Sequence, residues 1–107
     1  MDKLIITVEE KNLIQDFMDD TFSRVITWND LMPVVDKIEK YNYLEYFDIT
    51  IEKVLVFATN PKQQGIFNLT VPYGSRREIK TKKLAIFKAV FLTIEWLNKQ
   101  ENSCKFK

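Results

Sequence analysis

The chain has 107 residues, 46% apolar and 29% charged, with a formal net charge of +1. This length favours one domain, and the composition is that of an ordinary globular protein. Two glycines and three prolines exclude collagen-like and low-complexity classes. No apolar run approaches the ~18 residues of a membrane span, and residues 1–8 lack the features of a secretory signal. We therefore expect a cytoplasmic protein.

Several kinds of chemistry are excluded by what the sequence lacks. Without histidine, Ser-His-Asp and Cys-His catalysis and histidine-containing zinc sites are ruled out. The single thiol, Cys104, cannot form an intramolecular disulfide or a cysteine-rich metal site. Gly65 and Gly74 are isolated, so a glycine-rich phosphate loop is absent as well. We predict a protein that is not an enzyme and that uses no cofactor and no metal.

Charge is divided unevenly along the chain. Residues 1–52 carry twelve acids and five bases, a net charge of −7, and residues 53–107 carry three acids and eleven bases, a net charge of +8. Such asymmetry either produces an electrostatic dipole across the surface or cancels when the two halves pack together. The sequence leaves both arrangements open.

Two short helices are predicted in the first half. A capping box formed by Thr7 and Glu10 precedes a helix to about Asp19, after residues 4–6 that form a strand or an extended lead-in. Its apolar stripe consists of Leu13, Ile14, Phe17 and Met18. The second helix covers residues 28–40. Its N-cap is either Thr27, with Asp30 as its box partner, or Asp30 itself, which would place Pro33 in the first turn.

Strands are predicted in the middle of the chain, after an aromatic linker at residues 41–47. Residues 48–59 have a strand pattern whose apolar phase slips at residues 52–53, which indicates a bulge or a tight turn. After a turn-rich loop, residues 66–71 alternate, with Phe67, Leu69 and Val71 on one face. Because two strands alone bury little, we expect a third from residues 24–26, 3–8 or 73–80.

The last predicted element is a long helix that begins after Thr81 and runs to about Lys99. Its broad apolar arc consists of Leu84, Ile86, Phe87, Ala89, Val90, Phe91, Ile94 and Leu97. An arc of this width is typical of a helix that packs on a sheet, with or without a partner on its remaining side. The predicted fold is one α+β domain over residues 1–107, with helices packed as a sandwich on a small antiparallel β-sheet, a long C-terminal helix and flexible ends at 1–6 and 100–107.

Three segments, residues 12–18, 28–39 and 85–98, together resemble small uncharacterised phage and prophage proteins related to the phage α-β-α (ABA) sandwich group. The most distinctive part is the run Trp-Asn-Asp-Leu-Met-Pro-Val-Val-Asp-Lys-Ile-Glu at 28–39. The resemblance implies helices packed on an antiparallel sheet. It implies no activity and no catalytic residues, because the group has no established chemistry. The aromatic linker and the basic stretch at 76–83 depart from the group's pattern.

Two sets of residues are candidates for binding. The basic stretch, opposed only by Glu78, suits phosphate, nucleic acid or an acidic partner, with Tyr73 near enough to stack on a base. It contains Arg76, Arg77, Lys80, Lys82 and Lys83. The candidate partner surface contains Trp28, Tyr43, Tyr46 and Trp96. The alternatives are a solvated loop for the cations and the rim of the core for the two tryptophans.

The broad apolar arc, the aromatic linker and the divided charge predict a protein that binds another protein or itself. The resemblance implies that it is an accessory protein of a phage or prophage. In a homodimer, the acidic surface of one copy would pair with the basic surface of the other. The alternative function is a nucleic-acid or phosphate binder that uses the basic stretch. A membrane partner is not expected.

Overall fold

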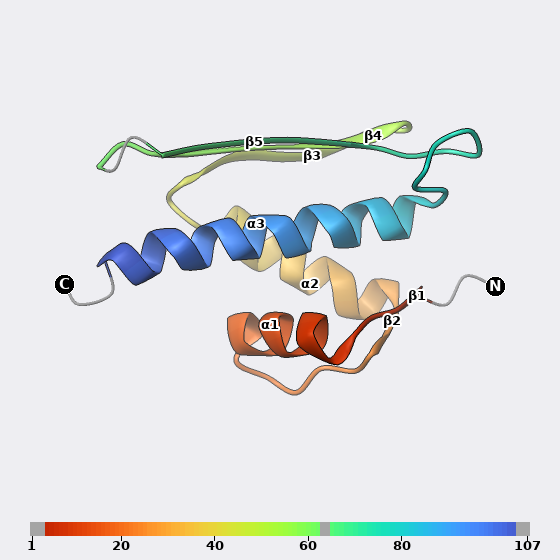
Figure 1. Cartoon of the computed structure of the whole chain (residues 1–107), viewed down its shortest axis with the longest axis horizontal. Coiled ribbons are helices and arrows are strands. Elements are labelled where there is room, and N and C mark those ends of the chain that lie inside the picture. Colours follow the sequence, from red (N-terminus) through yellow and green to blue (C-terminus); the bar gives the residue numbers. More distant parts are fainter. Residues whose placement is uncertain (1–3, 63–64, 105–107) are drawn as a thin grey trace.

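A computed structural model of the chain describes residues 4–62 and 65–104 (Figure 1). Its elements in chain order are β1 (Leu4–Ile5), α1 (Val8–Met18), β2 (Val25–Ile26), α2 (Trp28–Glu39), β3 (Leu44–Ile49), β4 (Lys53–Asn60), β5 (Gly65–Pro72) and α3 (Lys82–Cys104). Strands β3, β4 and β5 form an antiparallel sheet in that order, and β1 pairs antiparallel with β2. The predicted α+β class, with helices on a small antiparallel sheet and a long C-terminal helix, is confirmed.

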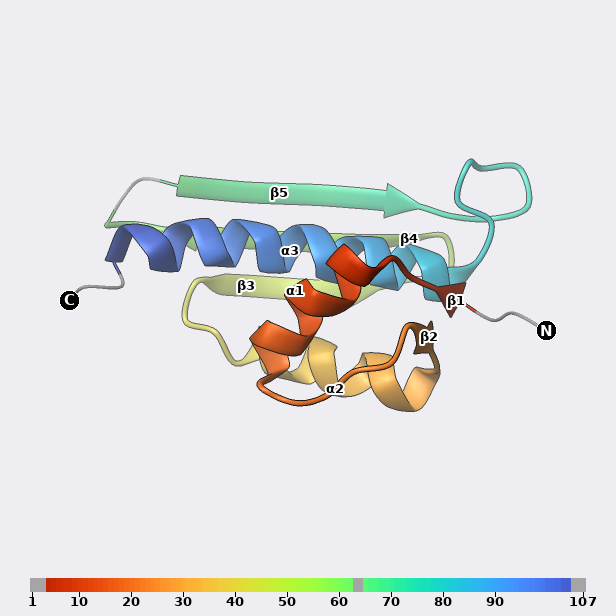
Figure 2. The same ribbon diagram turned by 60° about the horizontal axis from the view of Figure 1, so that its bottom comes forward.

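Helix α3 lies between two layers. The β3–β4–β5 sheet runs along one side of α3, and α1 and α2 lie on the opposite side (Figures 1 and 2). Accordingly, α3 contacts β4 and β5 as well as α1 and α2, while α2 also touches β3. Within the described part of the chain, no helix covers the outer face of the sheet.

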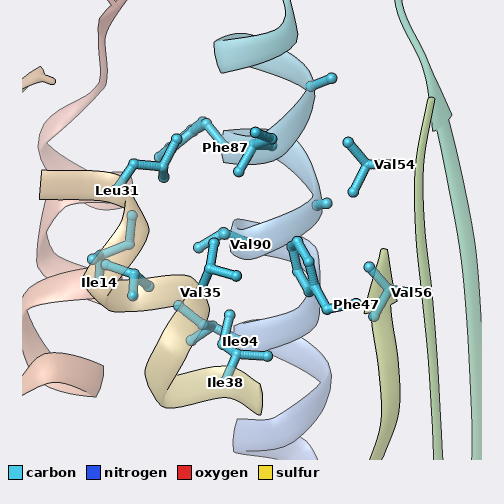
Figure 3. Packing of buried hydrophobic residues seen from close by; sticks show 14 of the residues in the cluster. Ile14, Leu31, Val35, Ile38, Phe47, Val54, Val56, Phe87, Val90 and Ile94 are labelled. Carbon is cyan, nitrogen blue, oxygen red and sulfur yellow. The ribbon is translucent and has the colours of Figure 1, made fainter. Parts of the chain in front are cut away.

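The breadth of the apolar arc follows from this position. The arc side that faces the sheet contains Trp96, which stacks on Phe67 of β5, and the fully buried Ala85 and Ala89 share that side by helical spacing. Phe87, Val90 and Ile94 point the other way, toward α2 (Figure 3). The chain itself therefore covers the apolar surface that the sequence analysis connected with a partner.

Both helices of the first half begin with the predicted capping boxes. The Thr7 amide donates to Glu10 Oε1 at 2.9 Å, and the Thr27 amide donates to Asp30 Oδ2 at 3.0 Å. Thr27 is thus the N-cap of α2, and the alternative that Asp30 is the cap is wrong. Pro33 consequently lies in the second turn, where it deprives the Asn29 carbonyl of an amide donor. Asn29 is exposed, so water can satisfy that carbonyl.

The aromatic segment corrects the prediction of a linker. Strand β3 begins at Leu44, and its alternation directs Phe47 inward and Tyr46 outward. The phase slip at 52–53 is a tight turn, in which the Thr50 amide donates to the Lys53 carbonyl at 2.9 Å. The sheet's bulge lies instead between Leu44 and Tyr46.

The third strand of the sheet is therefore β3, and the prediction that it comes from residues 24–26, 3–8 or 73–80 is wrong. Residues within the first two of those ranges form the separate β1–β2 pair. The Tyr and Phe residues of β3 favour extended backbone, but their mixed spacing concealed the alternation from the sequence analysis.

Secondary structure extends into both segments that the sequence analysis expected to be flexible. Leu4 and Ile5 pair with β2, and Ile6 is buried with its amide donating to the Arg24 carbonyl at 2.8 Å. The backbone of α3 continues to Cys104, beyond its predicted end near Lys99. The outermost residues of the two predicted flexible ends, 1–3 and 105–107, lie outside the described residues.

Candidate functional site

Residues 73–81 connect β5 to α3 and project beyond the end of the sheet (Figure 2). This basic loop contains Arg76, Arg77 and Lys80 of the basic stretch, while Lys82 and Lys83 begin α3. Backbone hydrogen bonds close this loop, from the Gly74 amide to the Ile79 carbonyl and from the Arg77 amide to the Gly74 carbonyl, both at 3.0 Å. Gly74 has a φ of 146°, a backbone conformation that side chains with a Cβ rarely adopt. The loop thus has a defined shape that presents its cations to solvent.

The five predicted cations differ in their surroundings. Arg76, Arg77 and Lys82 are exposed. Lys80 is exposed too, but its Nζ donates to the Ser75 carbonyl at 3.2 Å and helps to close the loop. Lys83 is half-buried, donates to the Ile26 carbonyl at 3.3 Å and lies 6.0 Å from the centre of the Trp28 ring. Lys83 therefore connects the start of α3 to β2 and α2, and these contacts stabilise the fold.

Tyr73 does not present a free ring to a nucleic-acid base. It is partly buried against the core, and its hydroxyl donates to the Thr50 carbonyl at 2.5 Å. Its amide donates to the Glu52 carbonyl at 3.0 Å, which extends the β4–β5 pairing by one residue. These contacts attach the start of the basic loop to the β3–β4 turn. They also make the Tyr73 ring unavailable for the base stacking that the sequence suggested.

The four residues of the candidate partner surface lie in three places. Trp96 stacks on Phe67 at 5.6 Å and meets Tyr43 edge-on at 6.2 Å, so these rings close the core near the C-terminal half of α3. Trp28 lies beside Lys83 at the other end of α3, about 20 Å away along the helix at 1.5 Å per residue. Tyr46 points to the outer face of the sheet.

That outer face is the feature that the sequence analysis missed. Tyr46 stacks on Phe57 at 5.7 Å, and Leu55 lies on the same side of β4. Ile66 of β5 joins them with 70% of its surface exposed, and Tyr46 is 42% exposed. We define these four side chains, Tyr46, Leu55, Phe57 and Ile66, as the outer patch. The signal in the sequence was the unbroken apolar run at 54–58, since a strand with one wet face normally alternates.

The two edges of the sheet are unequal. The β3 edge carries Glu45 and Asp48, contains the bulge and lies beside α2. The β5 edge contains no charged residue and pairs with β4 in unbroken register from Gly65 to Pro72. Charges, bulges and covering elements protect edge strands from pairing with other chains. By these criteria β3 is protected and β5 is open.

Among the side chains that the structure describes, in residues 4–62 and 65–100, no group of three or more Asp or Glu residues is placed to hold a metal ion. The helices of the same part of the chain include none that is long and apolar enough to cross a membrane. Comparisons with protein-family models, curated proteins and solved structures found no match. The resemblance to phage proteins therefore remains a prediction.

Proposed function

We propose that the protein is a non-enzymatic interaction module that binds a partner protein through the uncovered side of its sheet. The outer patch carries this proposal, because it combines a stacked aromatic pair with an Ile66 that is 70% exposed. Aromatic and aliphatic side chains of this kind anchor protein interfaces when a partner removes them from water. The expected role of a phage or prophage accessory protein in the host cytoplasm belongs to the same proposal.

The arrangement of the layers supports the sheet as the binding side. Except at Phe67 and Leu69 of β5, which are only partly buried, the inner surface of the sheet is covered within the chain, as are both sides of the apolar arc of α3. The outer patch is apolar surface that no element of the described residues covers. Other exposed apolar side chains, Ile5, Val8, Val25 and Trp28, lie at β1, β2 and the starts of α1 and α2, and the stacked aromatic pair distinguishes the outer patch from them.

Site-specific photo-crosslinking in cells tests the proposal. A photoreactive phenylalanine analogue is placed at Ile66, and a control carries it at Met32, which is 36% exposed on α2 on the opposite side of the molecule. We expect one dominant adduct from position 66, resolved by mass spectrometry into a defined protein, and much less from position 32. Equal adduct patterns at the two positions would contradict the proposal.

Anion binding by the basic loop is the second candidate function, because Arg76, Arg77 and Lys82 are exposed close to the N-terminus of α3. It predicts binding of a fluorescent single-stranded oligonucleotide that weakens with salt and is lost in the double variant Arg76→Glu, Arg77→Glu. The double variant Lys62→Glu, Lys88→Glu makes the same change in net charge at exposed positions elsewhere. Equal loss in both variants would show that binding follows net charge rather than this loop.

A further inference from the structure

Strand β5 offers hydrogen-bonding groups along its free edge. The Tyr73 amide donates to the Glu52 carbonyl, which fixes the phase of the ladder: residues 67, 69, 71 and 73 direct their backbone groups to β4. Ile66, Asn68 and Thr70 consequently direct one amide and one carbonyl each away from the sheet. Pro72, which lacks an amide, comes only at the end of the strand. An extended segment can therefore add to this edge over most of the length of β5.

Side chains on both faces of β5 suit an added strand. Phe67 and Leu69 on the inner face are only partly buried, although they pack against the core. A neighbour with apolar side chains on that face would complete their burial. On the outer face, Asn68 and Thr70 are exposed and polar, whereas Ile66 at the start of β5 is exposed and apolar. The matching segment therefore has apolar residues inside and, opposite Asn68 and Thr70, polar residues outside.

The positive charge of the basic loop determines the direction of the added strand and favours acidic residues next to it. The basic loop follows β5 directly, with Arg76 and Arg77 exposed at its tip. An antiparallel neighbour has its N-terminal end beside the C-terminal end of β5. Acidic residues that precede the added strand would then lie against these two arginines, where opposite charges speed association and set the register.

Charge repulsion disfavours a second copy of this chain at the β5 edge. Antiparallel pairing of two β5 strands would bring the residues before one β5 beside the basic loop of the other. Those residues include Lys62 and no acid. Like charges would meet at both ends of such a pair.

We propose that the β5 edge accepts, as a fourth antiparallel strand, an extended segment of a partner protein that carries acidic residues immediately before an alternating apolar and polar stretch. This inference rests on the proposed function, because it specifies the chemistry of the partner. It joins two features that the sequence analysis treated separately, the half-buried strand and the basic loop.

Synthetic peptides provide the test. The acid-first peptide has three Glu residues followed by alternating Thr and Val, and the acid-last peptide has the same strand followed by the three Glu residues. Each is titrated into isotope-labelled protein, with binding followed by NMR. We expect the acid-first peptide to shift the amides of Ile66, Asn68 and Thr70 and to bind at least about tenfold more tightly. Equal affinities, or no shifts along β5, would overturn the proposal.

Backbone methylation of the peptide tests the hydrogen bonds without altering the protein. Residues that bond to the β5 edge have side chains on the outer face, so they are the Thr positions of the acid-first peptide. Methylating the Thr amides should weaken binding at least about tenfold, whereas methylating the Val amides should change it little. The reverse order, or equal effects, would contradict strand addition.

Two pairs of protein variants complete the design. Asn68→Pro removes an outward amide and should abolish binding, while Asn68→Ala, which keeps that amide, should retain it. The double variant Arg76→Glu, Arg77→Glu should remove the preference for the acid-first peptide. The double variant Lys40→Glu, Lys88→Glu makes the same change in net charge at exposed positions outside β5 and its flanks, and it should preserve the preference. If Asn68→Pro leaves peptide binding unchanged while crosslinking at position 66 persists, the edge inference fails and the proposed function stands. If the protein forms a homodimer that the Asn68→Pro substitution dissociates, the occupant of the edge is a second copy of this chain, and the proposal of a foreign partner is overturned.

Discussion

Replacing Phe87 by alanine tests the central position of α3. Phe87 is 2% exposed, stacks on Phe91 with ring centres 6.2 Å apart and points toward α2, close to Leu31 (Figure 3). Removing a fully buried phenylalanine ring costs ~3–5 kcal/mol, from lost burial and from the cavity that remains. Phe91 is only partly buried, so Phe91→Ala should cost about half as much.

Urea unfolding followed by circular dichroism measures these differences. The dependence of the unfolding free energy on urea should stay the same in all variants, since the surface exposed on unfolding barely changes. In a thermal scan, Phe87→Ala should lower the Tm by more than about 12 °C, at roughly 4–8 °C per kcal/mol for a domain of this size. Leu92→Ala, on the exposed side of α3, is the control and should cost less than about 1 kcal/mol. If Phe87→Ala costs no more than Leu92→Ala, the assignment of the buried faces of α3 is wrong.

Three further substitutions have defined expectations. Thr27→Ala removes the N-cap of α2 and should cost about 1 kcal/mol in urea unfolding, whereas a loss near zero would show that the capping box contributes nothing. Asp19→Gly should stabilise by about 0.5 kcal/mol, because Asp19 has a φ of 58° and places a negative charge at the C-terminus of α1, and a lower Tm would refute this. Gln100→Ala leaves the buried Asn60 amide without its 2.8 Å acceptor and should cost ~1–3 kcal/mol, unlike Lys88→Ala, which serves as the exposed control.

Local signals predicted the helices well. The capping boxes at Thr7 and Thr27 depend on residues three positions apart, so the sequence shows both partners together. The β5 strand was equally accessible, because its alternation of Phe67, Leu69 and Val71 with polar residues is unbroken. Such patterns depend only on residues close together in the sequence. They can therefore be recognised without knowing which elements pack against them.

What the sequence did not show depends on which elements are adjacent in space. The sequence analysis left open whether a partner covers part of the α3 arc, because nothing in the arc itself distinguishes a second chain from α1 and α2. The strand at Leu44–Ile49 was taken as a linker, since its bulge interrupts the alternation near Tyr46. The outer patch and the open β5 edge could be recognised only once the strand order was known.

The place of α3 in the chain has a consequence for folding during synthesis. The β3–β4–β5 meander and the pair α1 and α2 are both made before α3, yet most of their apolar surface is covered only by it. When residues up to Lys80 have left the ribosome, the nascent chain therefore exposes two apolar surfaces. Chaperones bind exposed apolar surfaces of this kind. Arrival of α3 covers both surfaces together, because its two sides belong to one rigid rod. We expect the docking of α3 to be the slow step in folding, because it must close the long separation between α1 and α3 along the chain.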